Sequence, residues 1–341
     1  MEHLRNKCYS ELSADIDENG NVNIVDFLFT PDKILEELEP EGYSEYFNDW
    51  LEKRRLEMLS KGEEILSFHN NRSRFSALKS AYKSGSVIPF VGAGLSISSG
   101  YPGWTDFLLD IRSETRIQKE EIESLFDEGK YEEAAQKISD GLPDGGLDEI
   151  LENIFGLNNE LNGSVQMLPY VFEGSAVTTN FDNVLKRCYE NANRPFSEVL
   201  LGSHAVDLPK QVGRGERVLV KLHGKANSRI GRVLTSSEYQ EQYEGIIKLS
   251  DVISALSTRT LLFMGCSLTT DRTFLALCDL KASKSLENLV RHYALVPLKN
   301  GEDRIARRDL LAKANIFPIW YKEEDGHELC LEAIFYMLLE D

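Results

Sequence analysis

Cysteine and positive charge are both scarce in this 341-residue sequence. The five cysteines are scattered without a Cys-x-x-Cys pair, which argues against a zinc ribbon or knuckle. An odd, scattered set also argues against a disulfide framework and indicates a reducing, cytoplasmic setting. Lys and Arg number 38 against 56 Asp and Glu, so the formal net charge is -18. Such a surface repels phosphate backbones, and we expect no direct binding of nucleic acid.

Long hydrophobic runs are missing as well. The N-terminal stretch MEHLRNKCYSELSADIDENG is polar and acidic and lacks the apolar core of a signal peptide. No stretch is long and apolar enough to span a membrane, so we expect no membrane association. The remaining composition, 42% hydrophobic and 28% charged, suits a globular protein with one large domain and an appendage, or with two domains.

Residues 1–75 are predicted to form a helical N-terminal extension. Thr30 followed by Pro31 is typical of a helix start. This extension either packs on the main domain as a cap or serves as an arm for oligomerisation or partner docking. Apolar residues recur in it at helical spacing: Ile34, Leu35, Leu38, Trp50, Leu51, Leu56 and Leu59.

Residues 76–341 alternate between short apolar runs and helical patterns. This alternation predicts an α/β domain with a doubly wound, mostly parallel sheet. An acidic helical stretch at about 115–165 is interpreted as an insertion or lid beside the nucleotide fold. The chain ends in an amphipathic helix, HELCLEAIFYMLLE. The predicted strands are VIPFV at 87–91 and the runs at 176–179, 218–222, 260–265, 292–296 and 316–320.

Small and polar residues follow four of these strands. In an open parallel sheet, ligands bind outside the carboxyl ends of the strands. Core packing does not require polar groups there, so four such ends together indicate a nucleotide site. The four segments are Gly92-Ala93-Gly94-Leu95-Ser96, Asn180-Phe181-Asp182, His223-Gly224 and Cys266-Ser267.

The Gly-Ala-Gly turn allows the backbone to approach a pyrophosphate closely, and amides of a following helix would point at the anion. Two common nucleotide motifs do not fit. A G-x-G-x-x-G fingerprint would need glycine in place of Ile97, and a Walker loop would need a lysine that this turn lacks. A glycine turn used only for close packing stays open as the alternative.

The ordered set GAGLS, Gly100-Tyr101-Pro102, TTNFD, LHG and GCS resembles the sirtuin-type NAD-binding fold. It is most similar to the bacterial sirtuin-like NAD hydrolases of antiphage defence, from about residue 76 to the C-terminus. The resemblance implies that Asn180 and His223 are catalytic. It also implies that NAD is bound by Gly92, Ala93, Gly94, Ser96, Trp104, Asp106, Thr179, Asp182, Gly265 and Ser267.

Two departures from deacetylating sirtuins bear on the activity. Their four-cysteine zinc module has no counterpart here, so we expect no metal. Their Pro-Asp-Phe-Arg stretch is replaced by a segment in which Asp106-Phe107 is followed by leucine, which puts the parts of Trp104 and Asp106 in doubt. Both departures favour hydrolysis of NAD over peptide deacylation.

The residue types suit cleavage of a glycosidic bond. The Asn180 amide can position a water, and the His223 imidazole can accept a proton near neutral pH. Structural alternatives exist for each candidate. Asn180 or Ser267 would cap a helix, Asp182 would be a first-turn acid, and His223 would be a structural histidine. Cys266 is interpreted as a small buried residue.

The sequence therefore predicts an NAD hydrolase that releases nicotinamide and ADP-ribose. The resemblance implies an antiphage effector that depletes NAD when activated. Such an activity must be gated, which implies a homo-oligomer, a phage-derived trigger, or a partner such as a DNA-translocating ATPase. Three alternatives remain: a sensor that binds NAD or ADP-ribose without turnover, a protein deacylase, and a scaffold with a relic pocket.

Overall fold

The computed structural model of the chain describes most of the sequence. The described residues are 4–5, 7–8, 22–24, 27–29, 37, 39–207, 211, 215–244, 248–269, 271–283 and 289–340. The predicted helix start at Thr30-Pro31 and the positions Ile34, Leu35 and Leu38 lie outside them.

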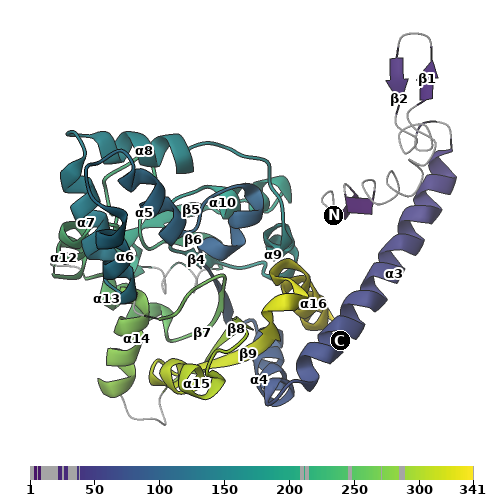
Figure 1. The fold of residues 1–341 in the computed structure, drawn as a ribbon. Helices are drawn as coiled ribbons and strands as arrows, with labels where there is room; N and C mark the ends of the chain where they lie inside the picture. Colours follow the sequence, from purple (N-terminus) through teal and green to yellow (C-terminus); the bar gives the residue numbers. More distant parts are fainter. Residues whose placement is uncertain are drawn as a thin grey trace.

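A seven-stranded, all-parallel sheet forms the centre of the molecule (Figure 1). Its spatial order is β5-β6-β4-β3-β7-β8-β9. Strand β3 is central, and the chain first builds the side carrying β4, β5 and β6 before it returns to β7, β8 and β9. The bounds are β3 (Val87–Val91), β4 (Ala176–Thr178), β5 (Glu198–Leu201), β6 (Val218–Lys221), β7 (Thr260–Met264), β8 (His292–Leu298) and β9 (Ile316–Lys322).

Helices cover both faces of this sheet because consecutive strand residues point to opposite sides. Phe90 belongs to one buried core and Val91 to the other, and Phe263 and Met264 divide in the same way. The first face packs against α13 (Leu249–Leu256), α14 (Arg272–Ser283) and α15 (Arg304–Lys313). The second face is covered by α3 (Pro40–Ser67), α4 (Asn71–Lys83), α5 (Trp104–Arg112), α6 (Lys119–Asp127), α7 (Tyr131–Gly141), α8 (Gly146–Phe155), α9 (Leu168–Val171), α10 (Val184–Asn191) and α16 (His327–Leu339).

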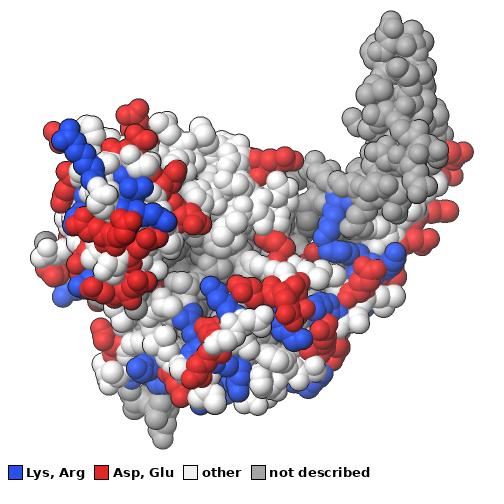
Figure 2. All heavy atoms as spheres, in the orientation of Figure 1, with Lys and Arg blue, Asp and Glu red and all other residues white. Residues whose placement is uncertain are grey.

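The predicted insertion is present as α6, α7 and α8, which gather with α5 beside the sheet (Figure 1). Acidic side chains concentrate over these helices (Figure 2). Side-chain contacts fasten them to the second half of the chain. Arg232 pairs with Asp148 of α8, and Arg272 of α14 pairs with Glu132 of α7. The insertion is therefore held against α14 and the loop that follows β6.

The long helix α3 extends from the body and packs along α16 (Figure 1). The buried Glu332 of α16 accepts two hydrogen bonds from the Arg54 guanidinium, one from Nε at 2.9 Å and one from Nη2 at 2.6 Å. It also pairs with Lys7. A side chain at Gly62 would collide with Met337, whose Cγ would lie 2.3 Å from the added Cβ. The expected domain division near residue 75 falls within α4.

The outer edge of β9 is covered by side chains of α4. Asn71 is fully buried, and its Nδ2 donates to Trp320 O at 2.7 Å and to Ile65 O at 2.7 Å. Its Oδ1 accepts from Trp320 N at 2.9 Å. Arg74 donates to Pro318 O. Asn71 thus joins the end of α3, the start of α4 and the last strand of the sheet.

The doubly wound fold is confirmed, and several local predictions needed correction. In the N-terminal extension, β1 (Val22–Ile24) and β2 (Phe27–Phe29) form an antiparallel pair, which we had not predicted. Strand β5 was also missed. Helices α12 (Ser236–Glu244) and α13 precede β7. Leu56 is exposed on α3, whereas Met58 faces the core. No described helix is long and apolar enough to cross a membrane.

Candidate active site

The strand order reverses between β3 and β7, and this is where ligands bind in open α/β sheets. Because every strand is parallel, the carboxyl ends of β3, β4, β6 and β7 meet at one edge of the sheet. The four segments singled out in the sequence all follow these ends. The fold therefore brings the Gly-Ala-Gly turn, the Asn180 turn, His223 and the Gly265 turn to the same edge.

The two glycine turns interlock. Gly92 N donates to Met264 O at 2.8 Å, and Gly94 N donates to Gly265 O at 3.0 Å. A Cβ added at Gly92 would lie 2.4 Å from Gly265 O, and one at Gly94 would lie 2.8 Å from Gly265 Cα. Gly265 itself has φ of +66°, a conformation that favours glycine. Close packing of the β3 and β7 loops thus requires all three glycines, whether or not they also face a ligand.

The turn after β3 continues into two short 3₁₀ segments, Ala93–Leu95 and Ile97–Ser99, and not into a long helix. Leu95 N and Ser96 N donate to carbonyls within this turn. Together with Gly92 N and Gly94 N, four amides of this turn therefore donate to backbone carbonyls. We had expected amides after the turn to point at an anion, but at these four positions the amides are bonded within the protein.

Asn180 follows β4 and is 4% exposed. Its Nδ2 donates to Gly92 O and to Ser96 Oγ, both at 3.0 Å. These bonds fix the amide plane against the β3 turn. Its Oδ1 is buried and has no hydrogen-bond partner in the described part of the chain. Helix α10 is capped at Asn183, not at Asn180. A buried acceptor held in place without a partner is suited to bind a ligand donor.

His223 follows β6 and is 6% exposed. Burial lowers the pKa of its imidazole to about 4, so the ring is neutral at pH 7. Its Nε2 is buried without a partner within the described ranges. The Tyr239 ring of α12 packs edge-on against it at 5.7 Å. Thr178 pairs with Lys221 across β4 and β6, and Asn180 and His223 each lie two residues beyond that pair.

Asp182 and Lys221 are both buried behind the Asn180 turn. Burial raises the pKa of the Asp182 carboxyl, while the Lys221 charge and hydrogen bonds from Val184 N and Ser96 act to lower it. Asp182 Oδ1 accepts from Val184 N at 2.9 Å. This bond reaches the first residue of α10, so Asp182 lies just before the helix and not in its first turn, as the structural alternative had it.

Trp104 contacts this cluster, and two other candidates lie further out. Its ring packs edge-on against Phe181 at 5.1 Å. Asp106 is exposed on α5 and makes no hydrogen bond to the cluster among the described residues. Ser267 is exposed, its carbonyl accepts from Arg307, and α14 begins only at Arg272. Thr179 is partly exposed.

Residues 174–319 match the family described as SIR2-like domain. The matched range contains the Asn180 turn, His223 and the Gly265 turn, and it begins after the Gly-Ala-Gly turn.

Curated relatives to which this chain is similar are named NAD(+) hydrolase ThsA. The Enterococcus faecium protein is 25% identical over 218 residues, which is 63% of this chain and 44% of that protein. The Bacillus cereus (strain MSX-D12) protein is 26% identical over 214 residues, 61% of this chain and 42% of that protein. The resemblance to sirtuin-like NAD hydrolases drawn from the ordered motifs is thereby confirmed. The chain spans less than half the length of these relatives.

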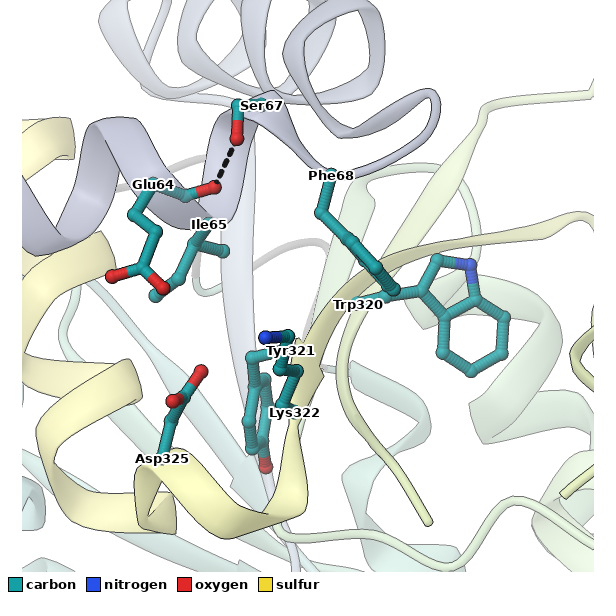
Figure 3. A pocket seen from close by; sticks show the side chains of 8 residues that line it. All are labelled: Glu64, Ile65, Ser67, Phe68, Trp320, Tyr321, Lys322 and Asp325. Carbon is teal, nitrogen blue, oxygen red and sulfur yellow. Dashed lines mark hydrogen bonds between the residues drawn. The ribbon is translucent and has the colours of Figure 1, made fainter. Parts of the chain in front are cut away.

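A separate cavity of about 180 Å³ lies away from this cluster, where α3 meets β9 (Figure 3). Figure 3 shows Glu64 and Asp325 on one side and Phe68 on the other. Lys61 pairs with both carboxylates and compensates one of their two negative charges. Within the described residues, no group of three or more His, Cys, Asp or Glu side chains is placed to hold a metal ion.

Proposed function

We propose that this chain is an NAD hydrolase that produces nicotinamide and ADP-ribose. The proposal rests on one observation: two buried polar atoms without protein partners in the described chain, Asn180 Oδ1 and His223 Nε2, follow neighbouring strands at the same register. Neighbouring strands lie about 4.8 Å apart, so a single ribose can reach both residues. The relatives are named NAD(+) hydrolase, which supports NAD as the substrate.

The reaction exchanges one bond at the ribose. The bond from C1 to the nicotinamide nitrogen breaks, and its electron pair neutralises the pyridinium, so nicotinamide leaves uncharged. Water forms the new bond to C1 and gives up one proton. The transition state has oxocarbenium character. The enzyme must therefore hold the ribose and orient the water more than it must activate the leaving group.

Asn180 and His223 supply these functions. The Asn180 oxygen can accept a hydrogen bond from the water or from a ribose hydroxyl. The His223 ring is neutral at pH 7 and therefore in its proton-accepting form. General-base assistance of this kind contributes about 10²–10⁴ in rate. Gly92, Ala93, Gly94, Ser96, Gly265 and Ser267 would face the phosphates and adenosine, and Asp182 and Trp104 the nicotinamide side.

The decisive experiment measures nicotinamide release from NAD by the purified chain, beside Asn180→Ala and His223→Ala. We expect release by the parent and loss in both variants. Undiminished release by both would refute the site. If none of the three releases nicotinamide while the parent binds NAD, the sensor alternative is favoured, and the assay is repeated with lysate of phage-infected cells to detect gating.

The proposal extends to biology through the resemblance. An NAD hydrolase must be inactive in a healthy cell, so we infer gating by a homo-oligomer, a phage-derived trigger or a partner ATPase that translocates DNA. NAD depletion during infection would then be the protective outcome. Size-exclusion chromatography with light scattering, and NAD measurement in infected cells, test the two parts separately.

A further inference from the structure

Lys221 is a charged residue in a place where the fold otherwise accepts apolar side chains. It is the last residue of β6, in the run Val218-Leu219-Val220, and is 3% exposed. Lysine is almost never this deeply buried unless its charge is compensated. The Asn, His and Gly motifs gave no reason to select it. The signal in the sequence was a lysine inside an apolar strand.

The Lys221 ammonium contacts the turn that carries Asn180. Its Nζ donates to Phe181 O at 2.9 Å and to Asp182 O at 2.7 Å. These two carbonyls immediately follow Asn180. On the opposite side, the Asn180 side chain is bonded to Gly92 and Ser96 of the β3 turn. The turn is therefore held from β6 on one side and from β3 on the other.

The charges around Lys221 form a small set. Asp182 faces it from the turn and favours its charged form, whereas Lys186 of α10 and Lys225 of the loop after β6 oppose that form. Its partners on β4 and β5, Thr178 and Leu201, are uncharged. Burial is the largest influence and lowers the pKa of the ammonium to about 8.

We propose that Lys221 is a positioning residue for NAD cleavage, which fixes the Asn180–Asp182 turn through the two carbonyls and so aims Asn180 Oδ1 at the ribose. This inference rests on the proposed function. Lys221 reaches the reaction through the turn and does not touch the reacting atoms. A misplacement of about 1 Å at such a site reduces rate by about 10²-fold.

The first test requires no catalysis. Hydrogen exchange of a peptide covering residues 178–186 is compared between the parent and Lys221→Met without NAD. The control is Lys281→Met, because Lys281 also donates to a backbone carbonyl, Ala312 O, but on α14. We expect faster exchange in the turn for Lys221→Met alone. Unchanged exchange would overturn the positioning role even if the chain hydrolyses no NAD.

The second test uses steady-state kinetics of nicotinamide release. We expect Lys221→Met to lower kcat by about 10²-fold with less than about tenfold change in KM, while Lys281→Met retains parental values. Lys221→Arg keeps the charge and the donors, so it should recover at least about a tenth of the parental kcat. Equal loss in the Met and Arg variants, or a loss confined to KM, would refute the role.

The third test is the pH profile of kcat. Because the pKa of Lys221 is about 8, the parent should lose activity as the pH rises from 7.5 to 9. Arginine stays charged in this range, so the decline should be absent in Lys221→Arg. An alkaline decline that persists unchanged in Lys221→Arg would show that another group titrates and would contradict the proposal.

Discussion

Two asparagines that are buried in the described part of the chain, Asn71 and Asn180, differ in their hydrogen bonding, and the difference separates structural support from chemistry. Asn71, beside β9, hydrogen-bonds through both its side-chain nitrogen and its side-chain oxygen to backbone groups of α3 and β9. Asn180, after β4, bonds through its nitrogen but leaves its oxygen without a partner in the described chain. Both are almost completely buried. The Asn71 amide is thus fully hydrogen-bonded within the protein, whereas the Asn180 oxygen is positioned to accept a hydrogen bond from a ligand.

Two buried histidines of the described chain, His223 and His292, repeat this contrast. Burial lowers the pKa of both His223 and His292 to about 4. His292 begins β8 at the amino edge of the sheet, and its Nδ1 accepts from Leu261 N at 3.2 Å. His223 lies at the carboxyl edge with Nε2 unengaged by the described residues. A perturbed pKa alone does not identify a catalytic group; an unsatisfied atom at the ligand-binding edge does so better.

The strongest test of the contrast compares His223→Ala with His292→Ala. We expect the first to reduce nicotinamide release about 10²–10⁴-fold. The second leaves Leu261 N without its acceptor and should cost about 1–3 kcal/mol of unfolding free energy. Activity assays and urea unfolding of both variants measure this. Similar kinetic losses in the two would abolish the distinction.

The asparagine pair offers the next largest effect. Asn180→Ala should lower kcat about 10²-fold, because the group that orients the water or ribose is lost. Asn71→Ala should leave kcat per folded molecule near the parental value. It removes three buried bonds and should destabilise the fold by about 2–4 kcal/mol. Calorimetry measures the stability of both variants, and steady-state kinetics measures their activity. A lower kcat in Asn71→Ala would contradict the assignment of Asn71 to structure and Asn180 to catalysis.

A pH dependence of stability should be shared by both histidines. Their folded pKa of about 4 lies below the unfolded value of 6.5, so the unfolded chain binds more protons between these values. Stability is complete above pH 6.5 and falls as the pH drops toward 4. At pH 5 each histidine should contribute a loss of about 2 kcal/mol. Urea unfolding at pH 7 and pH 5 should show this, with a smaller difference in His292→Gln.

The smallest expected effect concerns the ion pair of Arg272 with Glu132, which joins α14 to the insertion. The arginine side chain is 47% exposed, so solvent screens the pair. Arg272→Ala should change stability by less than about 1 kcal/mol. Thermal unfolding in low and high salt checks this. A larger loss would indicate that the insertion depends on this contact.

Most of the sheet was predictable because a buried parallel strand is a continuous apolar run bounded by turns. Six of its seven strands followed from that pattern. Strand β5 did not, because Glu198 and Val199 lie at an edge and are not fully buried. The antiparallel pair of β1 and β2 was not predicted either. Leu56 fitted the helical spacing but faces solvent, because α3 packs along only one side.

The candidate site was predictable in its members but not in their bonds. Parallel topology brings strand ends together, so a sequence that places polar residues after strands locates the site edge. It does not reveal that Gly92, Gly94 and Gly265 pack against one another, because that contact joins distant loops. The sequence also does not reveal the hydrogen bonds of Lys221, because its partners are backbone carbonyls and not side chains. Asp106 matched a motif fragment, but α5 places it on the surface.

The covering of β9 has a consequence for how the chain behaves in crowded solution. The outermost strand of a sheet offers unpaired backbone groups on which another molecule can add a strand and start aggregation. On β9, Pro318 has no N–H to offer and its carbonyl is taken by Arg74, while both backbone groups of Trp320 are taken by Asn71. At these positions the side chains of α4 block strand addition. Copies of the chain can therefore assemble through other surfaces without joining their sheets at β9.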